Sequence, residues 1–229
     1  EKPAALSSKI LRQSINKNRN FLNNKWIGYN RRFYETVDYL KARINKGGLK
    51  TVHVCISEDI ENHIKKHGKN IIPHLLSFSS SHILDLIFYL FGKVSILNLF
   101  KYNQTVHGEN FQSVNGILKT NDGVPILFQL NCNDPSFAGI FCKFDDNTNW
   151  SLSPLEKLTI YDKYKVIEEQ GKNIRQYLPS VSKEIYENNT FKPGFKKQIL
   201  EFINNNQSDK LSTIEEQLKI LNFIKKIKN

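Results

Sequence analysis

Two residues near the middle of the chain, His82 and Asp85, have the types and spacing that proton transfer requires. An imidazole titrates near neutral pH, which suits it to act as a general base toward a hydroxyl group. Positions three apart share one face of a helix, so we expect Asp85 to lie beside His82 and to orient its ring. Two simpler interpretations stay open. Asp85 in a first helical turn also complements the helix dipole, and His82 is also suited to a capping or core-edge position.

The other cysteines and histidines do not predict a metal site. The three cysteines, Cys55, Cys132 and Cys142, have no short paired spacing. Cys132 and Cys142 fall in apolar, strand-like segments, which indicates buried free thiols. His63 and His67 are four apart in a Lys-rich segment, so we interpret them as part of a solvated helix face.

The composition predicts a folded protein without a nucleic-acid partner. The chain has 229 residues, of which 39% are hydrophobic and 24% charged, enough apolar content for a core. Its net charge is +11, which raises the question of a polyanionic partner. The basic residues are mostly Lys scattered among Asn and Ile, without a basic-aromatic motif, so we expect no nucleic-acid binding.

The sequence also predicts neither a membrane span nor a signal peptide. The longest apolar candidate, residues 83–91, is far shorter than the ~18 residues that a transmembrane helix requires. The start is polar and Lys-rich and lacks the apolar region of a signal peptide. We therefore expect a cytoplasmic protein. The chain contains no Met, so we expect a piece of a longer protein.

Helical patterns must position the candidate residues. We expect helices over residues 3–22, 34–45 and 82–91, and the last of these carries His82 and Asp85. Residues 79–81 are serines that suit a helix start, and Gly92 suits its end. Residues 26–30 and 51–57 read as strands between the helices.

The central part of the chain reads as an antiparallel sheet. Turn residues separate four β-type runs over 94–102, 111–119, 124–132 and 139–144. In the third run the alternating apolar side chains predict a face that meets helices; these are Val124, Ile126, Phe128 and Leu130.

Beyond Trp150 we expect helix or loop, interrupted at Pro154, Pro179 and Pro193. The last helix has an expected capping box, Ser212 with Glu215. Its expected apolar stripe consists of Ile214, Leu218, Leu221 and Ile224. Together these elements predict an α+β layered architecture.

Three short motifs follow one another in a recognisable order. They are Glu1-Lys2-Pro3, Asn30-Arg31-Arg32-Phe33 and His82-Ile83-Leu84-Asp85. In this order they resemble the glucose-fructose oxidoreductase / inositol dehydrogenase (Gfo/Idh/MocA) family of NAD(P)-dependent oxidoreductases. The downstream strands are consistent with this resemblance, as are the Trp150-Ser151-Leu152-Ser153-Pro154 segment and the Lys192-Pro193-Gly194-Phe195 turn.

The resemblance implies a domain organisation. Residues 1–30 would be the last helix and strand of a truncated Rossmann domain, and residues 31–229 the substrate-side α+β domain. That domain would contain a large, mainly antiparallel sheet covered on one face by helices. The absence of a Gly-x-Gly-x-x-Gly phosphate loop is consistent with a missing N-terminal part.

The resemblance also implies roles for particular residues. Lys2, His82 and Asp85 would be catalytic, and a cofactor, NAD or NADP, would be contacted by Glu1, Lys2, Pro3 and Arg32. A role for Arg31-Arg32 at the domain junction is the alternative that we favour. Phe78 stands where many family members have an acidic residue, four positions before the His.

The implied activity is hydride transfer between a nicotinamide and a hydroxyl carbon of a sugar or sugar derivative. The implied assembly is a homo-oligomer formed through the open sheet face. The alternative is a non-catalytic fragment or pseudoenzyme that acts as an interaction domain.

Overall fold

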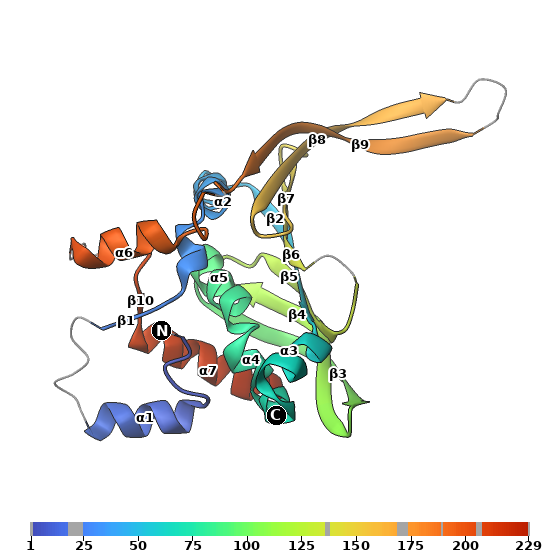
Figure 1. Ribbon diagram of the computed structural model, residues 1–229. Helices are drawn as coiled ribbons and strands as arrows, with labels where there is room; N and C mark the ends of the chain where they lie inside the picture. The colour runs from blue at the N-terminus through green and yellow to red at the C-terminus, as the bar shows by residue number, and fades with distance from the viewer. Residues whose placement is uncertain are drawn as a thin grey trace.

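An eight-stranded sheet forms the centre of the molecule in the computed structural model, which describes residues 2–17, 25–135, 138–168, 174–188, 190–204 and 208–228 (Figure 1). The strand order is β3-β4-β5-β2-β6-β7-β8-β9, and only the β2–β5 pair is parallel. The strands are β2 (Leu49–Glu58), β3 (Val94–Val106), β4 (Glu109–Thr120), β5 (Pro125–Cys132), β6 (Gly139–Phe144), β7 (Asn149–Leu152), β8 (Lys157–Glu168) and β9 (Arg175–Tyr186). The predicted α+β class and mainly antiparallel sheet are confirmed.

Helices lie against one side of this sheet (Figure 1). They are α2 (Glu35–Asn45), α3 (Ile60–His67), α4 (Leu75–Phe78), α5 (Ser81–Phe91) and α7 (Ile214–Lys228), with the 3-10 helices η2 (Asn30–Phe33) and η3 (Lys69–His74). Helices α1 (Ser8–Lys17) and α6 (Phe195–Ile203) lie toward the outside, together with a small sheet of β1 (Trp26–Ile27) and β10 (Ser212–Thr213).

The core forms where the alternating apolar side chains of the sheet meet the helices. Val54, Phe128 and Ile140 share a row across β2, β5 and β6, and all three are buried. The Phe128 ring meets the edge of Phe223 from α7, with ring centroids 6.4 Å apart. The predicted helix-facing side of residues 124–132 is therefore confirmed.

The opposite face of the sheet is open. A second row, one residue out of phase, crosses β4, β5, β2 and β6 through Ile117, Leu127, His53 and Phe141. Ile117 is 40% exposed and Leu127 is 47% exposed. Apolar side chains that are this exposed indicate that another protein surface would pack on this face of the sheet.

The expectation of helix or loop beyond Trp150 is wrong for residues 157–168 and 175–186. These two segments are the paired strands β8 and β9, which project from the body as an arm (Figure 1). Pro179 lies within β9, where it pairs with Tyr164. Because β9 is the edge strand of the sheet, the missing N–H of Pro179 does not exclude it from a strand.

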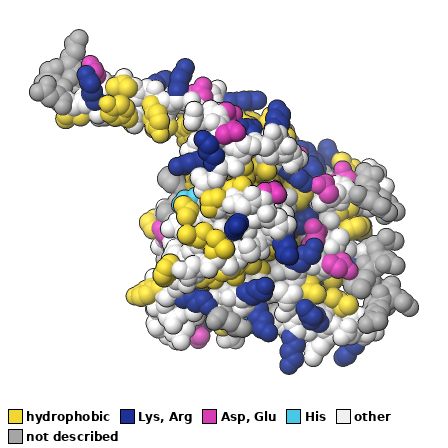
Figure 2. Space-filling view, turned by 180° about the vertical axis from the view of Figure 1, so that it is seen from behind, with side chains coloured by type: hydrophobic (Ala, Val, Ile, Leu, Met, Phe, Trp, Pro, Cys, Tyr) yellow, Lys and Arg dark blue, Asp and Glu magenta, His cyan; other side chains and the backbone are white. Residues whose placement is uncertain are grey.

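The arm carries exposed aromatic side chains, including Tyr164 and Tyr177. Figure 2 shows hydrophobic side chains along this arm and on the body beside it, with Lys and Arg dispersed among Asp and Glu.

Three predicted elements shift at their ends. The capping box of α7 is Thr213 with Glu216, not Ser212 with Glu215: Glu216 N donates to Thr213 Oγ1 at 3.2 Å, and Thr213 N donates to Glu216 Oε2 at 2.9 Å. The predicted strand over 26–30 is only the two residues of β1, followed by η2. The first helix begins at Ser8 rather than at residue 3, and residues 18–22 of the prediction lie outside the described residues.

The stretch Lys69–Phe91, which joins η3, α4 and α5, is long and apolar enough to cross a membrane. However, 61% of its most apolar 18-residue window is buried inside the protein. Buried helices at the core of soluble proteins have the same composition, so this stretch fits a soluble fold.

Candidate active site

Helix α5 holds both predicted proton-transfer residues near its first turn. It begins at Ser81 and ends at Gly92, where φ is +69°, a backbone conformation that favours glycine. Ser80 is the N-cap residue, but its hydroxyl donates to the Glu58 carboxylate instead of capping the helix. The helix is strongly apolar and most of it is buried, so its polar residues are held in fixed positions.

Asp85 is fully buried and forms a two-pronged pair with Arg32. Arg32 Nε donates to Asp85 Oδ2 at 2.8 Å, and Nη2 donates to Oδ1 at 2.6 Å. Burial raises the pKa of Asp85 to about 6, against the opposing effect of the Arg32 guanidinium. Arg32 Nη1 also donates to Glu216 Oε2 and to the backbone oxygen of Asp209, each at 3.3 Å. The pair is therefore ionised at neutral pH and ties η2, α5 and α7 together.

This pair bears on two expectations. Both carboxylate oxygens of Asp85 are bonded to Arg32, and not to the His82 ring that Asp85 was predicted to orient. Arg32 is 1% exposed and bonded to protein groups, as a structural role requires, and its expected contact with a cofactor stays a prediction. The sequence could not show this because 53 positions separate Arg32 from Asp85.

His82 differs from Asp85 because it lacks a hydrogen-bond partner at one ring nitrogen. Its Nδ1 atom is buried and has no partner among the described residues. The ring stands edge-on to that of Tyr29, with centroids 5.6 Å apart. Burial, with a smaller contribution from the cations Arg31, Lys2 and Lys192, lowers the pKa of His82 to about 2. The imidazole is therefore neutral at pH 7.

Lys2 lies next to the same helix, as the resemblance implies. Its ammonium group donates to the backbone oxygen of Phe78 and lies 5.0 Å from the centre of that ring. Because Phe78 is one turn before His82, Lys2 is held at the start of α5 and acts electrostatically on His82. Pro3, also expected near a cofactor, is half-buried, and Glu1 lies outside the described residues.

A turn far along the chain completes this region, and sequence reasoning did not place it. Asn30 Nδ2 donates to the backbone oxygen of Pro193 at 3.0 Å. Gly194 has φ of +76°, and a Cβ there would lie 2.2 Å from Asn30 O, so only glycine fits. This contact holds the turn that carries Lys192 against η2, which carries Arg31. The Lys192-Pro193-Gly194-Phe195 turn was the available signal, but a motif gives no position in space.

The expected solvated face of α3 is wrong for His63. Its Nε2 atom lies 3.0 Å from Glu58 Oε2, and its side chain is only 18% exposed. Its ring also meets Phe78 edge-on, at 6.4 Å. His63 therefore links α3 to the end of β2, close to the start of α5.

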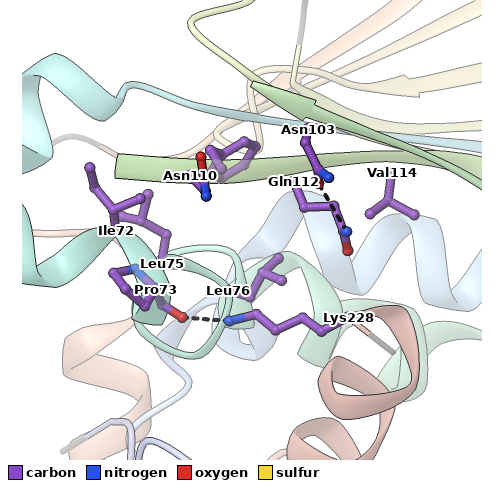
Figure 3. A pocket seen from close by; sticks show the side chains of 10 residues that line it. Ile72, Pro73, Leu75, Leu76, Asn103, Asn110, Gln112, Val114 and Lys228 are labelled. Carbon is purple, nitrogen blue, oxygen red and sulfur yellow. Dashed lines mark hydrogen bonds between the residues drawn. The ribbon is translucent and has the colours of Figure 1, made fainter. Parts of the chain in front are cut away.

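The cavity in Figure 3 lies away from this site. It has a volume of about 280 Å³ and is bounded by η3, α4, the β3–β4 hairpin and Lys228. Neither Lys2, His82 nor Asp85 lines it. Among the residues that the structure describes, no three His, Cys, Asp or Glu side chains form a metal-binding group. Cys142 is a buried free thiol as predicted, whereas Cys132 is half-buried.

Comparison with known proteins shows the fold. No protein-family model matches the sequence, and no curated protein matches it. A dehydrogenase from Chromobacterium violaceum is 12% identical with a TM-score of 0.70, and the match covers 99% of this chain and 67% of that one. UDP-N-acetylglucosamine 3-dehydrogenase GnnA from Acidithiobacillus ferrooxidans is 12% identical with a TM-score of 0.66, covering 99% and 68%. The chain has the fold of the Gfo/Idh/MocA oxidoreductases.

The Gfo/Idh/MocA fold also occurs in a super-repressor mutant of Gal80p from Saccharomyces cerevisiae, which is 13% identical with a TM-score of 0.67, covering 99% of this chain and 68% of that one. The chain spans about two thirds of the length of these solved structures. The shared part corresponds to the C-terminal part of the dehydrogenases.

Proposed function

We propose that this chain is the substrate-side part of an NAD(P)-dependent oxidoreductase that acts on a hydroxyl carbon of a sugar or sugar derivative. The observation that carries the proposal is the buried, unpartnered Nδ1 atom of His82 in a region that also holds Lys2. A buried polar atom without a partner costs free energy, and native proteins retain few of them. A hydroxyl group of a bound substrate supplies the partner that this atom lacks.

The chemistry divides between these two side chains. Oxidation of a secondary alcohol removes a hydride from the carbon and a proton from the oxygen, which leaves a carbonyl group. His82 is unprotonated at pH 7 and is able to accept the proton. Lys2, held by the Phe78 backbone oxygen, polarises the substrate oxygen as negative charge develops on it. A nicotinamide, when bound, supplies the hydride acceptor.

The proposed domain organisation follows from the same residues. Residues 1–30 would be the end of a dinucleotide-binding domain, whose Gly-rich phosphate loop would lie further upstream. Of the residues expected at the cofactor, Lys2 lies near His82, whereas Arg32 is committed to its pair with Asp85. The soluble fold supports placing the protein in the cytoplasm.

The proposal is tested in the longest protein that the gene encodes, with NAD or NADP and a panel of sugars. We expect His82→Ala to abolish turnover and to leave the affinity for the nicotinamide dinucleotide unchanged. His74→Ala, a half-buried histidine outside the site, is the matched control. Unchanged turnover in His82→Ala would remove His82 from the mechanism. A Gly-rich βαβ unit encoded upstream of Glu1 would support the cofactor assignment.

A second candidate is a non-catalytic interaction domain. The observation that favours it is the open sheet face, where large apolar side chains are exposed: Leu97, Phe100, Tyr102, Ile117 and Leu127. This chain shares its fold with the Gal80p super-repressor mutant, which is named as a repressor and not as a dehydrogenase. A homo-oligomer through this face is compatible with either function. Light scattering of the wild type and of Leu127→Asp tests this oligomer. An interface through the open face would dissociate in the variant, whereas the same molecular mass in both proteins would place the interface elsewhere.

A further inference from the structure

The region around His82 collects positive charge from three separate segments of the chain. Lys2 comes from the N-terminal segment, Arg31 from η2 and Lys192 from the turn before α6. Among the residues that the structure describes, the charged side chains that act on the His82 imidazole are these three, and all of them are cations. The carboxylate nearest in sequence, Asp85, is already paired with Arg32.

Backbone contacts hold these segments together. Asn30, next to Arg31, donates its side-chain amide to Pro193, next to Lys192. The absence of a side chain at Gly194 permits the two backbones to approach, since a Cβ would lie 2.2 Å from Asn30 O. Lys2 is fixed separately by the Phe78 backbone oxygen. Specific contacts therefore hold the three segments that carry the cations, and the Lys192 ammonium itself lies 4.5 Å from the centre of the Phe195 ring.

Like charges gathered around a half-buried ring repel one another unless an anion joins them. An arginine recognises carboxylate and phosphate groups through paired N–H donors, and lysines add point charges. The Nδ1 atom of His82, the ring on which these cations act, has no hydrogen-bond partner among the described residues. It is therefore able to pair with a neutral group such as a hydroxyl. The combination suits a molecule with a hydroxyl group and a negative charge close to each other.

We propose that the substrate is an anionic sugar derivative, whose carboxylate or phosphate group is bound by Lys2, Arg31 and Lys192 while its hydroxyl group meets His82. This inference rests on the proposed function and names the substrate class for it. Burial is the main cause of the lowered pKa of His82, and the cations add to it; an anion at this position would oppose the contribution of the cations and so make the imidazole a stronger base when substrate is present.

Calorimetric titration of the chain tests the proposal with four probes: glucuronate, glucose 6-phosphate, glucose and inorganic phosphate. We expect one or both of the charged sugars to bind and glucose to bind at least about tenfold more weakly. The two charged sugars distinguish a carboxylate from a phosphate as the recognised group. Inorganic phosphate binding as tightly as both charged sugars would show a non-specific anion site and overturn the proposal.

Charge-removing variants locate the binding. We expect Lys192→Gln and Arg31→Gln each to weaken the charged sugar by about 10- to 100-fold. The matched controls on the arm, Lys163→Gln and Arg175→Gln, should leave affinity unchanged. Lys192 is exposed, so its variant keeps the test decisive even if Arg31→Gln does not fold. Equal affinity in Lys192→Gln and wild type would overturn the proposal.

The longer protein separates this inference from the oxidoreductase proposal. Turnover of neutral sugars that is insensitive to Lys192→Gln would keep the oxidoreductase and overturn the anionic substrate. Binding of a charged sugar with no nicotinamide-dependent turnover would keep the anion site and count against the oxidoreductase. Binding of only the dinucleotide, weakened by Lys192→Gln, would assign the cations to the cofactor and overturn the proposal.

Discussion

His82 and Asp85 lie one turn apart on α5, yet their surroundings are opposite. Asp85 is a buried charge whose two oxygens are both bonded to Arg32. Within the described part of the chain, the neutral His82 ring has a nitrogen without a partner, and the charged groups that act on it are cations. A complete set of partners marks Asp85 as structural, whereas an incomplete set marks His82 as a place for a ligand.

The largest expected effect comes from breaking the structural pair. Asp85→Asn leaves Arg32 buried without its main counter-charge, so we expect it to lower the free energy of unfolding by about 3–5 kcal/mol. The matched control is Asp209→Asn, because Asp209 is 73% exposed and its pair with Lys41 is worth at most about 1 kcal/mol. Urea unfolding measures both. Equal losses in the two variants would show that burial of the Arg32–Asp85 pair does not matter.

The next largest effect concerns the contact that brings Lys192 to the site. In Gly194→Ala the new Cβ would meet Asn30 O, so we expect a loss of about 1–3 kcal/mol beyond the cost of the positive φ. Gly47→Ala is the matched control, because Gly47 also has a positive φ but its Cβ would meet open space. Thermal unfolding of the two variants compares them. A loss in Gly194→Ala no larger than that in Gly47→Ala would contradict the close approach.

The Arg32–Asp85 pair and the Asn30–Pro193 contact also show how much of the structure the sequence can predict. The strands before Trp150 and the apolar helix were predictable because alternation and helical periodicity are local. The Arg32–Asp85 pair and the Asn30–Pro193 contact were not, because they join residues 53 and 163 positions apart. The motif order placed Lys2 and His82 in one site, but spacing alone misassigned Asp85 as the partner of its neighbour on the helix.

Some local errors have equally physical causes. Ser212 and Thr213 both cap helices well, and Glu215 and Glu216 stand at the right distance from each, so the sequence left the choice to tertiary structure. Pro179 indicated a break between elements, although a proline is compatible with an edge strand, and strand order is not visible in a sequence.

The pH dependence of stability tests whether His82, unlike Asp85, is buried in its neutral form. The folded pKa is lowered, so the unfolded chain binds a proton below about pH 6.5 that the folded chain does not. Acid therefore favours unfolding, and we expect this residue to remove about 1.5 kcal/mol of stability between about pH 6.5 and 5. His82→Gln should lose that part of the pH dependence, while the exposed-histidine control His67→Gln should keep it. Urea unfolding at the two pH values measures the free energy of unfolding of each variant. An equal change in this free energy between the two pH values in His82→Gln and in wild type would contradict the prediction.

The smallest expected effect comes from the capping box of α7, which contains Glu216, a partner of Arg32. Thr213→Ala removes the acceptor for Glu216 N, so we expect a loss of about 1 kcal/mol. Ser212→Ala should cost less, because the Ser212 hydroxyl has no partner among the described residues. A larger loss in Ser212→Ala than in Thr213→Ala, measured by thermal unfolding, would restore the originally predicted capping box.

The most direct test of the central claim, that His82 is an unsatisfied ligand site surrounded by cations, is an NMR titration of its imidazole in the chain without ligand and with a charged sugar. The account predicts that the His82 ring resonances of the chain alone do not change between about pH 8 and 5, and that glucuronate or glucose 6-phosphate brings a protonation step into this range. Titration of His82 near its ordinary pKa of about 6.5 without ligand, and no response to either sugar, would contradict it.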